Sequence, residues 1–216
     1  MEREYRDQKN VCDLLSSSFI RPFFILNVPA AKLGCMSGTL FLIVGASGVG
    51  KDTLIDLLKC RFPDICYPRR YITRPADKGG EDYISVTEEA FKTMIVDDEF
   101  CVHWQAHGLL YGAHADIKTT IEGGRSVVLN TSRSVISLFE SQFPRTVVVE
   151  VTADKESLRE RLLDRGRESP EDIEARLARE VPRICCKVLE QVDNSKDISA
   201  AFAALEAVVI KQTEAA

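Results

Sequence analysis

Three short apolar segments rich in β-branched residues occur along this chain, at positions 40–44, 126–129 and 146–151. Continuous apolar runs of this length predict strands of a parallel sheet that is buried on both faces. Segments with helical periodicity or capping residues lie between and after them, at 53–59, from Thr87 onward, and at 115–122, 155–164, 170–187 and 199–211. The alternation predicts an α/β fold in which helices cover both faces of a parallel sheet.

The interval from about residue 70 to residue 112 interrupts this alternation. It lacks helical periodicity over 70–86 and contains short predicted strands near 100–102 and 109–111. Ligands of open α/β sheets bind at the carboxyl ends of the strands, so we interpret the interval as an acceptor-binding insert. The chain then divides into an N-terminal extension at 1–35, expected to be disordered or loosely packed, and a domain at 36–216 whose core covers 39–69 and 113–212.

The first apolar run leads into a glycine-rich segment, G-A-S-G-V-G-K-D-T, at residues 45–53. A strand, such a loop and a helix form the phosphate-binding loop of nucleoside-triphosphate enzymes, because backbone N–H groups and a helix N-terminus surround an anion. The predicted nucleotide-binding residues are Gly45, Ala46, Ser47, Gly48, Val49, Gly50, Lys51, Asp52 and Thr53. Lys51 is expected to contact the outer phosphates of ATP.

Asp52 departs from the phosphate-loop pattern, which has Ser or Thr at this position as a magnesium ligand. Carboxylate oxygen suits Mg²⁺, so Asp52 could hold the ion directly or through water. The alternative is an acidic residue in the first helical turn that only complements the helix dipole.

The composition restricts the possible partners. A net charge of −5 argues against general nucleic-acid binding, whereas 17 arginines against 11 lysines, clustered at 69–74 and 159–183, indicate small phosphorylated ligands. The seven cysteines have no disulfide or zinc spacing, so we expect reduced thiols in a cytoplasmic protein. The apolar segment at 19–26 is interrupted by Arg21 and Pro22 and is too short to span a membrane, so no membrane association is expected.

Taken together, these segments resemble the guanylate kinase family over about residues 39–212. The family's acceptor-phosphate motif is matched by Thr73-Arg74, and the tyrosine that follows it in the family is matched by Tyr83. The family's Tyr-Gly pair is matched by Tyr111-Gly112, and its arginine-bearing lid by the segments 164–168 and 175–177. The resemblance implies a P-loop nucleoside-triphosphate hydrolase fold with an acceptor insert at about 70–112 and a lid at about 160–180. It also implies ATP and Mg²⁺ as ligands.

Three positions depart from the guanylate kinase pattern. Val102 stands where the family has a glutamate that reads guanine, Asp77 where it has a second phosphate-binding arginine, and Asn130 where it has an aspartate. A valine cannot accept hydrogen bonds from a base, and a site built for polar recognition loses orders of magnitude without its polar partner. We therefore expect an acceptor other than GMP.

One branch of the family agrees with these departures. The segments 50–52, 70–74, 104–112 and 164–168 are similar to those of the ribose 1,5-bisphosphate phosphokinases of phosphonate breakdown, which use ATP to form 5-phospho-α-D-ribose 1-diphosphate (PRPP). Such an acceptor has no base, which agrees with Val102. It has two phosphates, which agree with the cluster of Arg69, Arg70 and Arg74.

This resemblance implies roles for individual residues. Lys51, Arg165 and Arg176 are expected to stabilise the transferring phosphoryl group, with Arg161 and Arg167 as weaker candidates. The residues expected to hold the acceptor phosphates are Arg70, Arg74, Tyr83 and Tyr111, the two tyrosines having packing as their alternative role. Trp104 and His107 either shape the sugar pocket or pack against it.

Two other functions stay open from the sequence alone. One is a guanylate or other nucleoside monophosphate kinase that recognises its base differently, and the other is a non-catalytic guanylate kinase-like binding module. Such modules typically have degraded phosphate loops, whereas Gly48, Gly50 and Lys51 are intact here. A regulatory GTPase is disfavoured, because the D-K-G-G at 77–80 is followed by no N-K-x-D motif. The sequence leaves monomer and homodimer equally open.

Overall fold

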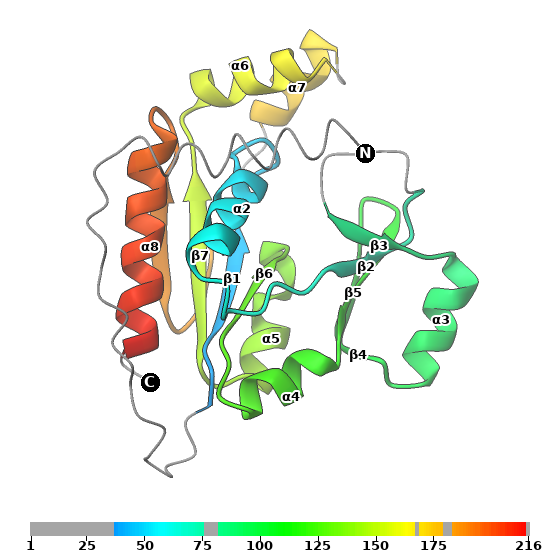
Figure 1. The fold of residues 1–216 in the computed structure, drawn as a ribbon. Helices are drawn as coiled ribbons and strands as arrows, with labels where there is room; N and C mark the ends of the chain where they lie inside the picture. Colours follow the sequence, from blue (N-terminus) through cyan, green and yellow to red (C-terminus); the bar gives the residue numbers. More distant parts are fainter. Residues whose placement is uncertain (1–36, 76–81, 167–168, 179–182, 215–216) are drawn as a thin grey trace.

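The computed structural model describes residues 37–75, 82–166, 169–178 and 183–214, so the predicted N-terminal extension lies outside the described part (Figure 1). The centre is a parallel sheet with the strand order β6 (Val127–Asn130), β1 (Leu40–Val44), β7 (Thr146–Thr152) and β8 (Leu189–Asp193). Leu40 of β1 lies opposite Val127 on one side and Thr146 on the other. The predicted α/β fold with a parallel sheet is therefore confirmed.

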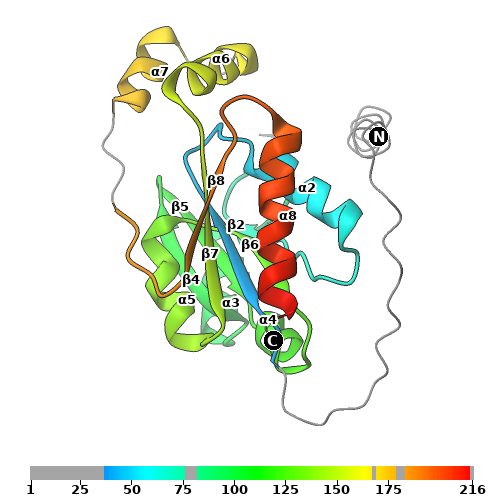
Figure 2. The ribbon, with the colours of Figure 1, turned by 90° about the vertical axis from the view of Figure 1, so that its left-hand side faces the viewer.

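The central strand β1 supplies side chains to two hydrophobic cores. Phe41 and Ile43 pack with α2 (Lys51–Arg61) and α8 (Ile198–Glu214), which lie on one face of the sheet. Leu40 and Leu42 pack on the other face with α4 (Asp116–Glu122), with α5 (Ile136–Gln142) and with the short 3-10 helix η1 (Arg133–Val135) that precedes α5. β1 lies inside the central sheet, between β6 and β7 (Figure 2). Every residue of β1 is buried, which explains its uninterrupted apolar sequence.

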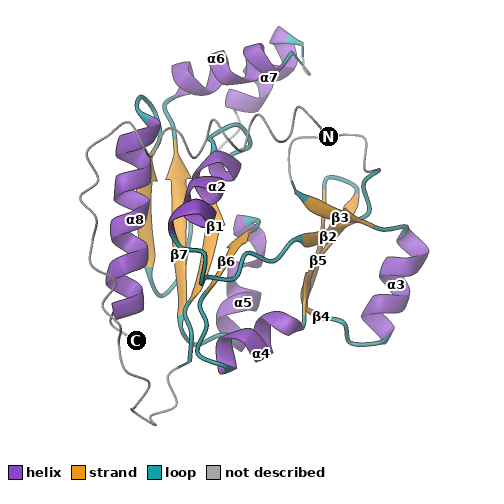
Figure 3. Ribbon diagram, viewed as in Figure 1, coloured by secondary structure: helices purple, strands orange, loops and turns teal. Residues whose placement is uncertain are grey.

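A second, smaller sheet contains β2 (Arg70–Ile72), β3 (Tyr83–Ser85), β4 (Phe100–Ala106) and β5 (Leu109–His114), in the order β3-β2-β5-β4. Only the β2–β3 pair is parallel. α3 (Glu88–Val96) covers this sheet through Phe91, whose ring stacks on Phe100 with centroids 4.6 Å apart. The sheet lies to one side of the central sheet (Figure 3), and its buried Trp104 and Tyr111 join the core of α5.

Two helices lie beyond the carboxyl end of the central sheet (Figures 1 and 2). They are α6 (Lys155–Arg165) and α7 (Pro170–Leu177), and each begins at a side-chain cap, Asp154 and Ser169 respectively. The guanidinium of Arg159 on α6 donates two hydrogen bonds, of 2.5 and 3.0 Å, to the carboxylate of Glu174 on α7. This bidentate ion pair joins the two helices across the segment between them.

The sequence prediction is wrong at 170–187, where one long helix was expected. The helix that begins at Pro170 ends at Leu177, residues 179–182 lie outside the described part, and the strand β8 follows. The described residues 183–186, between α7 and β8, are not helical. The proline at position 182 of the sequence was a signal against one continuous helix, because proline has no backbone N–H and disfavours a helical conformation of the preceding residue. In β8 only Val192 is buried, which left no apolar run to signal a strand. The helix α5 was also not predicted.

No helix in the described part of the chain combines the length and the apolar character that a membrane crossing requires.

Candidate active site

The phosphate-loop residues form a tight turn between β1 and α2. Gly45 and Gly50 have φ values of 154° and 90°, which only glycine adopts readily. A Cβ added to Gly45 would lie 2.4 Å from the Val151 carbonyl oxygen, and one added to Gly50 would lie 2.5 Å from Nδ2 of Asn194. At these two positions the loop has room for backbone only, and its tight backbone turn fits a cradle for phosphate oxygens.

Neighbouring side chains fix the loop from both sides. Nζ of Lys51 donates to the carbonyl oxygens of Gly45 and Ala46, at 3.0 Å each. Behind the loop, Nδ2 of the buried Asn194 donates to the Val49 carbonyl at 2.8 Å, and Arg161 of α6 donates to the Asn194 carbonyl at 2.7 Å. Arg161 therefore contacts the support of the loop. Asn194 was not singled out from the sequence, because it follows a strand that gave no signal.

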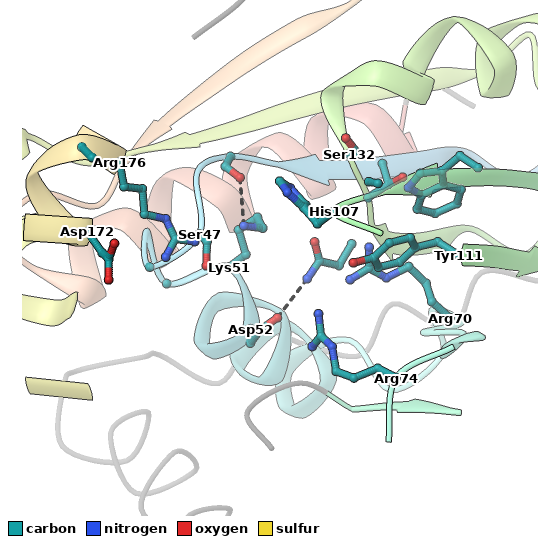
Figure 4. Close-up of a pocket in the computed structure, with 18 of the residues that line it drawn as sticks. Ser47, Lys51, Asp52, Arg70, Arg74, His107, Tyr111, Ser132, Asp172 and Arg176 are labelled. Atoms are coloured by element: carbon teal, nitrogen blue, oxygen red, sulfur yellow. Dashed lines mark hydrogen bonds between the residues drawn. The ribbon is translucent and has the colours of Figure 1, made fainter. Parts of the chain in front are cut away.

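One cavity of about 720 Å³ opens in front of the loop (Figure 4). The phosphate loop and Lys51 form one part of its wall, and Asp172, Ala175 and Arg176 of α7 form another. The small sheet lines the opposite part. The structure thus brings together Gly45, Ser47, Gly48, Gly50, Lys51, Asp52, Arg70, Arg74, Tyr111 and Arg176 among the residues predicted from the sequence. We call the wall at the phosphate loop and α7 the donor half, and the wall at the small sheet the acceptor half.

Two aromatic rings and two arginines shape the acceptor half. The Trp104 and Tyr111 rings are stacked, with centroids 5.4 Å apart and planes at 10°. The guanidinium carbon of Arg70 lies 5.7 Å from the centre of the Tyr111 ring, and Arg70 is only 8% exposed. Cation–π contact and burial hold this guanidinium in place. Arg74, the second arginine, is half-buried beside it on the cavity wall.

Tyr83 has a different place from the other predicted acceptor residues. Its ring lies under the guanidinium of Arg74, at 5.5 Å, and its hydroxyl donates to the Pro75 carbonyl at 2.6 Å. Among the described residues, the cavity wall includes Arg74 but not Tyr83. Val102 lies on the same face of β4 as Trp104, but it is buried in the hydrophobic core.

Asp52 lies where the donor and acceptor halves meet. Its carboxylate accepts a hydrogen bond of 2.9 Å from the side-chain amide of Asn130, at the carboxyl end of β6. Thr131 and Ser132, which follow Asn130, also line the cavity. Sequence reasoning did not select these two residues, although a position just after a parallel strand was the available signal. Within the described ranges, no group of three or more His, Cys, Asp and Glu side chains is placed to bind a metal.

Next to the main cavity lies a smaller one of about 100 Å³, which shares Asp52, Arg70 and Asn130 with it. Tyr67 lines this smaller cavity, and burial raises the pKa of its hydroxyl above the ordinary value for tyrosine. The neutral hydroxyl donates to the Phe62 carbonyl at 3.2 Å. Tyr67 therefore adds no negative charge beside the arginines.

Some predicted residues lie outside the described part, and two others lie away from the cavity wall. The side chain of Arg165, at the end of α6, lies outside the described part, as do Arg167 and Asp77. Arg183 is described but lies after the end of α7, so it is not on the helix to which the sequence assigned it. Thr53 is exposed on α2.

Comparison with known proteins identifies this architecture. A family model described as "Guanylate kinase" matches residues 37–212. The chain belongs to the guanylate kinase family. The fold of a guanylate kinase from Anaplasma phagocytophilum agrees with this membership, with a TM-score of 0.60 at 17% identity over 82% of this chain and 87% of that one. The resemblance stated from the motifs is confirmed.

Curated relatives indicate the branch of the guanylate kinase family. The ribose 1,5-bisphosphate phosphokinase PhnN of Rhizobium etli is 45% identical over 154 residues, which are 70% of this chain and 78% of that protein. The protein of the same name from Ruegeria sp. is 40% identical over 186 residues, 85% of this chain and 97% of that one. The predicted similarity to this branch is therefore confirmed.

Proposed function

We propose that this protein transfers the γ-phosphoryl group of ATP to ribose 1,5-bisphosphate, giving PRPP and ADP. Its membership of the guanylate kinase family and its similarity to the two PhnN proteins over most of each chain support the assignment. The observation that carries it is the acceptor half of the cavity, where Arg70 and Arg74 stand beside the aromatic wall of Trp104 and Tyr111. These groups suit phosphates and a sugar, and Val102, which is apolar and buried in the core, offers no hydrogen-bond partner to a base.

The reaction joins two polyanions. An oxygen of the 1-phosphate forms a new bond to the γ-phosphorus, the bond from that phosphorus to the β–γ bridging oxygen breaks, and ADP leaves with the electron pair. The attacking oxygen is already anionic near neutral pH, so the step needs no general base. The main tasks of the protein are alignment of the two substrates and neutralisation of their charge.

We assign these tasks to named side chains. Lys51 binds the outer phosphates of ATP above the backbone cradle, and Arg176 stabilises the transferring group from α7. Arg165, at the end of α6, keeps the same proposed role from its sequence match. Arg70 and Arg74 bind the acceptor phosphates, and Tyr111 faces them. Tyr83 positions the guanidinium of Arg74 through its ring contact.

The proposed reaction uses Mg-ATP, and we assign Asp52 as a residue that would hold the Mg²⁺ ion. The carboxylate and the neighbouring Asn130, Thr131 and Ser132 side chains offer oxygen ligands at the edge of the phosphate cradle, a donor set that suits this ion. Bound there, Mg²⁺ supplies positive charge to the phosphate oxygens of the donor. The amide of Asn130 orients the carboxylate of Asp52.

The role of Asp52 can be tested without turnover. Mn²⁺ binding to the protein with ADP, followed by electron paramagnetic resonance, is expected to weaken strongly in Asp52→Asn. The variant Asp56→Asn, on the same helix but facing Lys59, is the matched control. Equal Mn²⁺ binding by Asp52→Asn and the wild type would leave Asp52 as an acid that only complements the helix dipole.

The activity itself is tested with the intact chain, Mg-ATP and one acceptor at a time. We expect ADP release with ribose 1,5-bisphosphate, PRPP as the product in phosphorus NMR, and little turnover with GMP. Turnover with GMP alone would identify a guanylate kinase. Absence of turnover with any phosphorylated acceptor would favour a binding module.

A further inference from the structure

The hairpin between β4 and β5 ends in a two-residue turn over the cavity. Ala106 and Leu109 form the last pair of the ladder, so His107 and Gly108 make the turn, with φ values of 51° and 73°. Positive φ at both central positions is typical of the type I′ turn, in which Asn-Gly is the preferred pair. Histidine adopts positive φ more often than most residues, but it is not among the preferred residues at the first position of this turn.

The backbone around the turn is fixed from β2. The amide N–H of Leu110 donates to Oγ1 of Thr73 at 2.9 Å, and the amide N–H of Thr73 donates to the Leu110 carbonyl at 3.1 Å. Thr73 directly precedes the cavity residue Arg74. The tip of the hairpin therefore has a defined position relative to the acceptor half, and the backbone that carries the His107 side chain is held in place.

The imidazole of His107 lines the cavity although the residue is exposed. In Figure 4 it lies between Lys51 of the donor half and Tyr111 of the acceptor half, and all three residues line the same cavity. A non-glycine residue held at positive φ costs about 1–2 kcal/mol, and such residues are concentrated at functional sites.

We propose that His107 is an acceptor-binding residue whose imidazole N–H donates a hydrogen bond to an oxygen of the sugar phosphate where the two halves of the cavity meet. This inference rests on the proposed function and names a contact that the phosphate-loop and arginine motifs do not include. His107 reaches the cavity from the β4–β5 turn, whereas Arg70 and Arg74 reach it from β2 and the residues that follow β2. A hydrogen bond to a charged oxygen is stronger than a neutral one.

The variant His107→Gly separates binding from folding. Glycine adopts positive φ readily and Gly-Gly is a preferred type I′ pair, so the turn is kept, whereas the side-chain N–H donor is lost. The matched control is His103→Asn. His103 is exposed on β4, one position before Trp104, and therefore points to the other face of the sheet.

Steady-state kinetics and isothermal titration with ribose 1,5-bisphosphate test the proposal. We expect His107→Gly to lower kcat/KM for the acceptor and its binding constant by about tenfold to a hundredfold. The KM for ATP, the melting temperature and the His103→Asn control should stay near the wild type.

Each outcome supports or overturns a specific statement. If the wild type turns over ribose 1,5-bisphosphate and His107→Gly retains its acceptor kinetics, His107 is only a turn residue and the inference is wrong. If ATP and acceptor parameters change together, His107 contacts the donor and the inference is also wrong. If the wild type does not phosphorylate the sugar, the proposed function fails first, which the same assay reports separately.

Discussion

The donor half of the cavity depends on backbone geometry at the phosphate loop, whereas the acceptor half depends on side chains from three strands of a separate sheet. Gly45 and Gly50 leave no room for a Cβ, and Lys51 bonds to carbonyls of the same loop. By contrast, Arg70, Tyr111 and Trp104 are placed by pairing and ring stacking. The backbone of the donor half therefore tolerates little change in sequence. In the acceptor half, substitution of side chains can change which ligand is bound while the strands stay in place.

The largest expected effect comes from the charge in the donor half. Lys51→Ala should lower kcat by at least about a hundredfold, because one preorganised charged donor to the transferring group is lost. ADP release under saturating ribose 1,5-bisphosphate measures the change. Lys59→Ala, which removes an exposed lysine at the end of the same helix, should leave kcat unchanged.

The comparison predicts that acceptor binding survives the loss of Lys51. Trp104 is the only tryptophan of the chain and lines the cavity, so its fluorescence reports on the acceptor half. Lys51→Ala should bind ribose 1,5-bisphosphate with the wild-type dissociation constant. A large loss of acceptor binding would show that the two halves are not independent. Near-normal turnover in a folded variant would contradict the phosphate-loop assignment.

A glycine pair tests the backbone side of the comparison. Gly45→Ala brings a Cβ against the Val151 carbonyl. This variant should lower the melting temperature much more than Gly108→Ala does. At Gly108 an added Cβ meets no atom within 4 Å, so only the positive φ opposes it, at about 1–2 kcal/mol. For a chain of this size each kcal/mol corresponds to about 2–4 °C. Equal shifts would mean that the loop tolerates a side chain.

The two halves also differ in how much the sequence predicted. The donor half occupies nine consecutive residues, so one motif identified Gly45, Lys51 and their neighbours. The acceptor half requires the β2–β5 register, in which Ile72 lies opposite Tyr111, before Arg70 and Tyr111 can be known to meet. The motif resemblance named both residues but could not give their contact.

Elements with weak local signals were the ones that the sequence missed. The strand β8 has one buried residue, Val192, and the turn residue Asn194 follows it. Nothing near Asn194 in the sequence indicates that its amide supports the phosphate loop from 145 positions away. Contacts of this kind arise from tertiary packing and carry no periodicity.

On the acceptor side, Arg70→Lys should raise the KM for ribose 1,5-bisphosphate by about tenfold and leave the KM for ATP unchanged. Lysine keeps the charge but loses the planar fork and the stacking on Tyr111, which lies 5.7 Å away. Arg69→Lys is the matched control. The sequence grouped Arg69 with Arg70 and Arg74, but in the structure Arg69 is exposed, faces Asp82 at 3.5 Å and is not on the wall of the main cavity. Equal kinetics for Arg70→Lys and the wild type would remove Arg70 from the acceptor site.

The smallest effect is expected at Tyr83, and it decides between two roles for this residue. Tyr83→Phe keeps the ring under Arg74 and removes only the hydroxyl that donates to the Pro75 carbonyl. If Tyr83 positions Arg74, the acceptor KM should change by no more than about threefold, the scale of a half-exposed neutral hydrogen bond. If its hydroxyl binds a phosphate directly, Tyr83→Phe should match Tyr111→Phe, whose residue lines the cavity. If Tyr83 positions Arg74, Tyr83→Ala should weaken acceptor binding further than Tyr83→Phe, because Arg74 loses the ring that holds it.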